Sequence, residues 1–308
     1  MSRLKVRLFG KFLAEQNGRR LEGLEGPKLQ ELFAYLLIYK GKSHDREELA
    51  SLLWGDTDTA QSKKYLRQAL WHLSSALNPG DDLSVGRVLV VGQDRVDVDS
   101  KADLWIDIAE FENAFTAVKG VPGHEMELNA TATLKAAAEL YRGDLLEGCY
   151  HDWCLFERER LQSTYIIILD KLMDYSEASS QFESGIVYGN RILCIDRARE
   201  RTHRRLMRLH YLSGDRTASL RQYKRCADAL LEELSVKPAK KTVELYEQIR
   251  RDQFCAPSYA KNAQATGPEG AGQDTVGLLG ELRKSLKGFQ ARIKQEIETI
   301  DAVLKDQR

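Results

Sequence analysis

The order of elements in the first hundred residues is the feature that most constrains the fold. Residues 4–8 alternate apolar and basic side chains, as a half-buried strand does. Residues 12–24 are typical of one or two further strands joined at the turn pair Asn17-Gly18. The chain is therefore expected to begin with a small antiparallel sheet.

Three helices and a hairpin are expected after this sheet. The first helix begins at Pro27 and ends at Gly41, and the second begins at the capping residue Asp45. The third covers residues 59–77, and residues 87–99 contain two β-rich runs joined by a turn. A sheet, three helices and a hairpin in this order predict a winged helix-turn-helix domain over residues 1–100.

Acidic residues are absent from the third helix. No aspartate or glutamate occurs between Asp58 and Asp81, although 46 acids in 308 residues would place about three there by chance. Helical periodicity predicts a buried stripe formed by Leu66, Ala69, Leu70, Leu73 and Leu77. The opposite face then carries Lys63, Lys64, Arg67, Gln68, Trp71, His72 and Ser75.

The chemistry of this face favours DNA as a partner. Cations bind phosphate oxygens, and amides and hydroxyls bind base edges in the major groove, where carboxylates would repel the backbone. Arg87 and Arg95 of the hairpin are expected to reach an adjacent groove. A solvated helix face that merely lacks acids is the alternative. We favour DNA because the helix is the third of three and precedes a hairpin.

Residues 103–252 are predicted to be helical throughout, with breaks near residues 120–123, 143, 148, 179–181, 214 and 236–238. A shift of 34 residues places Leu172-Met173 over Leu206-Met207, Ser180 over Gly214, and Gly185 over Ser219. This shift is the period of tetratricopeptide repeats. Chance similarity between two amphipathic hairpins is the alternative, and we favour a helical solenoid.

The last part of the chain differs in composition. Residues 255–277 combine proline, glycine and alanine with few large apolar residues, which predicts a flexible linker. Residues 278–308 predict an amphipathic helix with an eleven-residue repeat of apolar positions, namely Leu282, Leu286, Phe289, Ile293, Ile297, Ile300 and Leu304. Packing on the repeat domain and pairing with another chain remain equally open, whereas mixed charges disfavour a membrane surface.

Composition limits the cellular setting. The formal net charge is zero, so contact with DNA has to come from a local basic patch. The N-terminus lacks the apolar core of a secretory signal, no 18 apolar residues are consecutive, and the five cysteines form no CxxC pair. We predict a cytoplasmic protein that does not bind membranes. Only three residues precede Leu4, so we expect no receiver domain there.

Two further clusters contain side chains that occur in binding sites. CYHDWC at residues 149–154 contains metal-ligand types, but its spacing fits no common zinc motif. No phosphate loop, nucleophile elbow or metalloprotease helix occurs, so we expect no metal, no cofactor and no enzymatic activity. Six arginines crowd residues 197–208, namely Arg197, Arg199, Arg201, Arg204, Arg205 and Arg208. We favour a solvated face for them; a surface for an acidic or phosphorylated partner is the alternative.

Several stretches resemble the SARP-type bacterial regulators, the Streptomyces antibiotic regulatory protein family. In the first half these are GPKLQELFAYLL, REELASLLW, YLRQALWHLSSAL and DLWIDIAEFENAF. In the second half, LYRGDLLEG, DWCLFERERL, RERTHRRLMRLHYLSGDRTASLRQYKRC and LLEELSVKPAKKTVELYEQI look like the bacterial transcriptional activator domain of that family, a tetratricopeptide-like module. Together the motifs cover about residues 4–250.

The resemblance implies a transcription factor that binds repeated promoter elements and engages RNA polymerase. The sequence departs from the family in three places. The arginines that usually end the third helix are Ser74 and Ser75 here, which bears on a phosphate contact. The Asp-Pro of the first repeat is Asp196-Arg197, and the glycine before Val236 is Ser235; both changes affect turns. Residues after 277 lie outside the resemblance.

We therefore predict a mainly α protein with a small β component. Its expected parts are a DNA-binding domain at 1–100, an activator domain at 101–254, a linker at 255–277 and a helix at 278–308. The expected function is sequence-specific regulation of transcription, as an activator, with promoter DNA and RNA polymerase as partners and a homo-oligomer formed through residues 278–308. The alternative is a protein-interaction scaffold whose winged helix docks protein in place of DNA.

Overall fold

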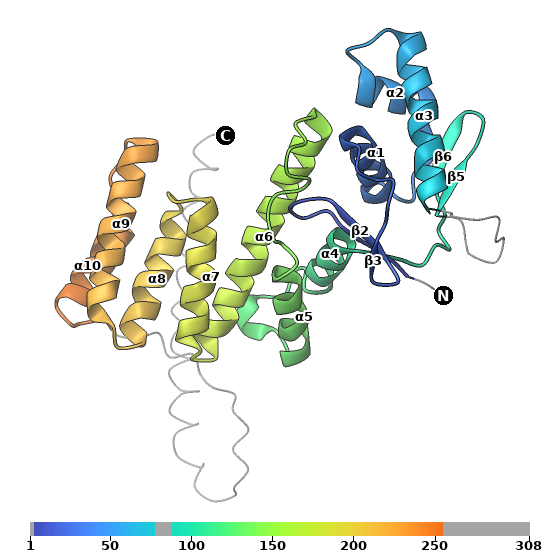
Figure 1. Cartoon of the computed structure of the whole chain (residues 1–308). Coiled ribbons are helices and arrows are strands. Elements are labelled where there is room, and N and C mark those ends of the chain that lie inside the picture. Colours follow the sequence, from blue (N-terminus) through green and yellow to red (C-terminus); the bar gives the residue numbers. More distant parts are fainter. Residues whose placement is uncertain (1–2, 78–87, 255–308) are drawn as a thin grey trace, which may run out of the picture. The chain divides into compact units, whose positions relative to one another are not determined.

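The computed structural model describes residues 3–77 and 88–254 (Figure 1). This part of the chain is mainly α with two small sheets, which confirms the predicted fold class for the described residues. Arg87, the predicted linker at 255–277 and the predicted helix at 278–308 lie outside the described residues.

The first sheet has the strand order β3-β2-β1-β7. The predicted antiparallel strands are β1 (Leu4–Arg7), β2 (Leu13–Gln16) and β3 (Arg19–Arg20), and Asn17 and Gly18 both have positive φ, as a tight hairpin turn requires. The strand β7 (Leu104–Ile106) was not predicted, and the expectation of helix from residue 103 is wrong there. It pairs in parallel with β1, whose open edge it covers.

The three predicted helices are α1 (Pro27–Ile38), α2 (Arg46–Trp54) and α3 (Thr59–Leu77). Proline occupies the first turn of α1, and the Asp45 carboxylate caps α2 by accepting from the backbone N–H of Glu47 at 2.7 Å. The predicted hairpin is β5 (Leu89–Val91) and β6 (Arg95–Val98). A two-residue strand, β4 (His44–Asp45), joins β6 and ties the hairpin to the start of α2.

Helices dominate after β7. In chain order they are α4 (Asp107–Ala117), the short 3₁₀ helix η1 (Gly123–Glu125), α5 (Leu128–Ala138), α6 (Asp152–Ala178), α7 (Phe182–Ile195), α8 (Glu200–Leu212), α9 (Arg216–Leu234) and α10 (Lys240–Arg250). From α6 to α10 each helix packs against the next as an antiparallel hairpin (Figure 1). The predicted breaks lie at or near the ends of these helices, whereas the break between α7 and α8, at residues 196–199, was not among them.

The 34-residue shift corresponds to a structural repeat. Ser180 and Gly214 both adopt left-handed backbone, with φ of +59° and +88°, in the turns that end α6 and α8. Gly185 and Ser219 are both buried where neighbouring helices touch, and a Cβ at Gly185 would lie 2.9 Å from Leu209 Cδ1. The tetratricopeptide-like interpretation is therefore confirmed.

The irregular segment between α5 and α6 forms hydrogen bonds with the residues that directly follow β1. Residues 140–151 contain the LYRGDLLEG motif, and Leu146 donates its N–H to the Leu8 carbonyl at 2.9 Å. Arg158, from the DWCLFERERL motif, donates through Nη2 to the carbonyls of Leu145 at 2.9 Å and Cys149 at 3.0 Å. These two motifs thus fold together as one supporting unit.

One hydrophobic core spans both predicted domains, from Leu4 to Ile192. Asp107, only 2% exposed, accepts hydrogen bonds from the N–H groups of Leu8 and Phe9 at 2.9–3.0 Å. The Tyr39 hydroxyl donates to Glu157 of α6 at 2.8 Å. The described residues belong to one compact unit, and the domain boundary at residues 100–101 stays a prediction.

Candidate nucleic-acid interface

The helix α3 is fixed in rotation by its apolar stripe. Asp58 caps its N-terminus by accepting from the N–H groups of Ala60 and Gln61, each at 3.0 Å. The buried positions are Ser62, Leu66, Leu70, Leu73 and Leu77, and the predicted Ala69 is half-buried. Because these leucines pack against α1 and α2, the opposite face has to point outward.

The predicted residues of α3 share this outward face. Lys63 is half-buried, and the exposed ones are Lys64, Arg67, Gln68, Trp71, His72 and Ser75. The arginine that the DNA hypothesis most needs, Arg67, is open to solvent. The structure thus brings all seven residues to one surface; their role in binding DNA stays a prediction.

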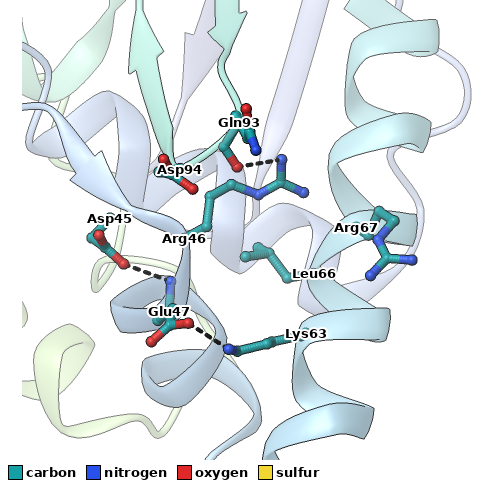
Figure 2. Close-up of a pocket in the computed structure, with 8 residues that line it drawn as sticks. All are labelled: Asp45, Arg46, Glu47, Lys63, Leu66, Arg67, Gln93 and Asp94. Atoms are coloured by element: carbon teal, nitrogen blue, oxygen red, sulfur yellow. Dashed lines mark hydrogen bonds and ion pairs between the residues drawn. The ribbon is translucent and has the colours of Figure 1, made fainter.

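Lys63 differs from the other cations of this face. Its ammonium forms an ion pair with the carboxylate of Glu47 in the first turn of α2 (Figure 2). This pair offsets the charge that Lys63 could offer a phosphate. Within the described residues, Lys64 and Arg67 form no ion pair, so they carry the uncompensated charge of the helix.

Arg46 fixes the turn of the hairpin to α2. Its Nη1 donates to the Gly92 carbonyl at 3.0 Å and to the Gln93 carbonyl at 3.3 Å, and Figure 2 shows the bond to Gln93. Its backbone N–H donates to the Asp94 carbonyl at 2.9 Å. Arg95, at the start of β6, is exposed and forms no ion pair with any described residue. The role of Arg46 was not predicted from the sequence, because its acceptors, the carbonyls of Gly92 and Gln93, are distant in the chain.

An open cavity of about 370 Å³ lies between α2, α3 and the hairpin, lined by Asp45, Arg46, Glu47, Lys63, Leu66, Arg67, Gln93 and Asp94 (Figure 2). The Asp45 carboxylate is occupied as a helix cap, and Glu47 is paired with Lys63. Arg67 is the cation of this cavity without a described partner. It lies where α3 and the hairpin could hold one phosphate between them.

All six arginines of residues 197–208 form ion pairs, but Arg205 alone among them is buried, so the expected solvated face is wrong for Arg205. Its guanidinium is buried and contacts Asp170 at 2.9 Å, Asp174 at 3.3 Å and Glu177 at 3.4 Å. Arg208 contacts the same Glu177 at 3.3 Å. The reason is that the three acids follow one face of α6, which packs against the helices that follow it.

The CYHDWC segment contributes to packing. Cys149 and Cys154 are buried, and the Cys154 thiol donates to the Leu145 carbonyl at 3.7 Å. The neighbouring Cys154 thiol lowers the pKa of Cys149. No group of three or more His, Cys, Asp or Glu within residues 3–77 and 88–254 is placed to hold a metal ion. In the same part of the chain, no helix combines the length and apolar character needed to cross a membrane.

Part of this chain matches a known protein family, and its fold is similar to a solved structure. Residues 106–250 match the family described as the bacterial transcriptional activator domain. The structure of Mycobacterium tuberculosis EmbR in complex with a low affinity phosphopeptide is similar, with a TM-score of 0.67 and 20% sequence identity over 83% of this chain and 67% of that chain, a likeness in fold. Curated protein sequences give no match. Residues 106–250 therefore match a bacterial transcriptional activator domain, the module that the motifs in the second half of the sequence implied, and the likeness to the solved structure supports the same fold.

Proposed function

We propose that this protein is a sequence-specific DNA-binding transcriptional activator that places α3 in the major groove of promoter DNA. The observation that carries the proposal is the outward face of α3, which is exposed, basic and free of carboxylates. Lys64 and Arg67 offer uncompensated charge to phosphates, and Gln68, His72 and Ser75 offer hydrogen-bonding groups to base edges.

The hairpin supports the same arrangement. Arg95 is exposed on β6, and Arg46 together with β4 holds this hairpin against the start of α2. In winged helix-turn-helix proteins the hairpin contacts DNA beside the groove that the third helix enters. We infer that Arg95 contacts a phosphate there, while Arg46 positions the hairpin.

The activator domain is inferred to carry the signal to the transcription machinery. Its helices from α6 to α10 form a tetratricopeptide-like series, an architecture suited to binding proteins. RNA polymerase is the partner that the resemblance to SARP-type regulators implies. Homo-oligomers through residues 278–308 and a cytoplasmic location are parts of the same proposal.

Salt dependence tests DNA binding through α3. Each phosphate neutralised by a cation contributes about 0.9 to the slope of log affinity against log salt, so Lys64→Ala and Arg67→Ala should each flatten that slope by about one. Lys119→Ala is the matched control, because Lys119 is an exposed lysine of the activator domain. Duplexes enriched by the wild-type protein from a randomised pool serve as probes.

The ion pair of Lys63 sharpens this test. Lys63→Ala should flatten the slope by clearly less than one, because Glu47 already holds the ammonium. Glu47→Gln should steepen it by releasing Lys63 to a phosphate. A slope that is flat for the wild-type protein, or one that Lys119→Ala changes as much as Arg67→Ala does, contradicts the proposal. Capture of proteins with no DNA preference would instead support the scaffold alternative.

A further inference from the structure

Trp71 stands out on the outward face of α3. Its side chain is 65% exposed, more than any other large apolar side chain described in residues 3–77 and 88–98. Its ring packs edge-on against that of His72, with centroids 4.9 Å apart and an angle of 73° between the planes. This contact limits where the indole can point, while most of the side chain stays open to solvent.

The indole of Trp71 cannot bind phosphate as the neighbouring cations of this helix can. It carries no charge and only one N–H donor, so it binds phosphate poorly. Lys64 and Arg67 already supply cations on the same face. In the major groove, the apolar group that a side chain can contact is the C5 methyl of thymine.

Gln68 is placed to contact the base pair next to the one that Trp71 contacts. It precedes Trp71 by three residues, so the two side chains are neighbours on one helix face, with a rise of about 4.5 Å between them. Successive base pairs lie about 3.4 Å apart, which is close to that rise. The carboxamide of Gln68 is exposed, and carries the donor and acceptor that match N7 and N6 of adenine.

We propose that Gln68 and Trp71 read adjacent A·T base pairs, Gln68 through the N6 and N7 atoms of adenine and Trp71 through the thymine methyl group. The inference rests on the proposed function, and it specifies which bases the centre of α3 selects. Lys64 and Arg67 hold the flanking backbone, and Ser75 tolerates several bases because a hydroxyl can donate or accept.

Removal of single thymine methyl groups tests the role of Trp71. The wild-type protein first selects duplexes from a randomised pool, and each thymine of the enriched site is then replaced by deoxyuridine. One position should weaken binding by the wild-type protein about fourfold, the loss expected for one buried methyl group. Trp71→Ala should bind the thymine and uracil duplexes equally, whereas Trp71→Phe should keep most of the difference.

A modified adenine tests the proposed contact of Gln68. Replacing single adenines by 7-deazaadenine removes the N7 acceptor, and should weaken the wild-type protein at a position next to the methyl-dependent one. Gln68→Ala should be indifferent to that replacement. Both residues are exposed, so each variant should keep the melting temperature of the wild-type protein.

The outcomes separate the inference from the function. An enriched site without A·T pairs overturns the inference alone. So does a uracil effect that is equal in the wild-type protein and Trp71→Ala. If the wild-type protein enriches no sequence at all, the proposed sequence-specific function itself fails.

Discussion

Replacing Arg205 by alanine should destabilise the repeat domain far more than replacing a neighbouring arginine. The guanidinium of Arg205 is 7% exposed and bridges three carboxylates of α6, so the variant leaves these acids without their shared cation. Arg197 provides the matched comparison. It pairs with Glu232 at 3.1 Å, but both side chains are about 60% exposed.

The expected magnitudes follow from burial. Glu177 is only 3% exposed and would keep Arg208 as its ion-pair partner, at 3.3 Å, while Asp170 would keep only the longer contacts of Arg199 and Arg201 at 3.8–3.9 Å. Removing one partner of a buried ion pair costs about 3–5 kcal/mol, because a charge stays buried without compensation. An exposed pair contributes about 0–1 kcal/mol. The two variants should therefore differ by at least about 2 kcal/mol in the free energy of unfolding.

Urea unfolding of the full chain, followed by far-ultraviolet circular dichroism, measures this difference. The helical signal should lose its cooperative transition at lower urea in Arg205→Ala than in Arg197→Ala. Arg205→Lys should fall between Arg205→Ala and the wild-type protein, since an ammonium keeps the charge but cannot bridge several carboxylates in the same way. Equal midpoints for the two alanine variants would show that the network contributes no more than surface charges do, and would refute the reasoning.

Two other predictions concern the same domain. Ser235 ends α9 with a left-handed φ of +55°, so Ser235→Gly should raise the free energy of unfolding by about 0.5–1 kcal/mol; a lower melting temperature in that variant would count against it. His203 donates from Nε2 to the Arg197 carbonyl and accepts at Nδ1 from Gln222, each at 2.8 Å, and burial lowers its pKa from the ordinary 6.5. The unfolded chain therefore takes up the proton first, so this stability is present above pH 6.5 and is lost as the pH falls below 6.5 and through the lower pKa of the folded protein. In His203→Gln the melting temperature should fall less on acidification than in the wild-type protein. His210, whose pKa burial also lowers, should account for part of the remaining fall.

Local patterns predicted most of the fold. The third helix was predicted over residues 59–77, the bounds that the structure shows, because its apolar period and the turn signals at both ends are visible in the sequence. The breaks predicted near residues 179–181 and at Gly214, where the 34-residue shift aligns Ser180 with Gly214, are turns in the structure. The outward face of α3 could be predicted as well, since burial of one helical stripe determines what lies opposite.

Features that depend on distant partners could not be predicted in this way. The strands β4 and β7 have two and three residues, too few for a periodic signal, and exist because β6 and β1 offer open edges. Arg205 looked like a solvated residue because its partners Asp170 and Glu177 lie on a different helix. The Glu47–Lys63 pair could not be predicted for the same reason, since its two residues lie on different helices, α2 and α3.

Site-specific photo-cross-linking tests most directly whether α3 lies in the groove of DNA. A benzophenone amino acid placed at Ser75, which is exposed on the outward face, should cross-link to an enriched duplex, and added salt should suppress the product. The same group placed at Lys119 should give no DNA product. Cross-linking from position 119 without any from position 75 would contradict the account.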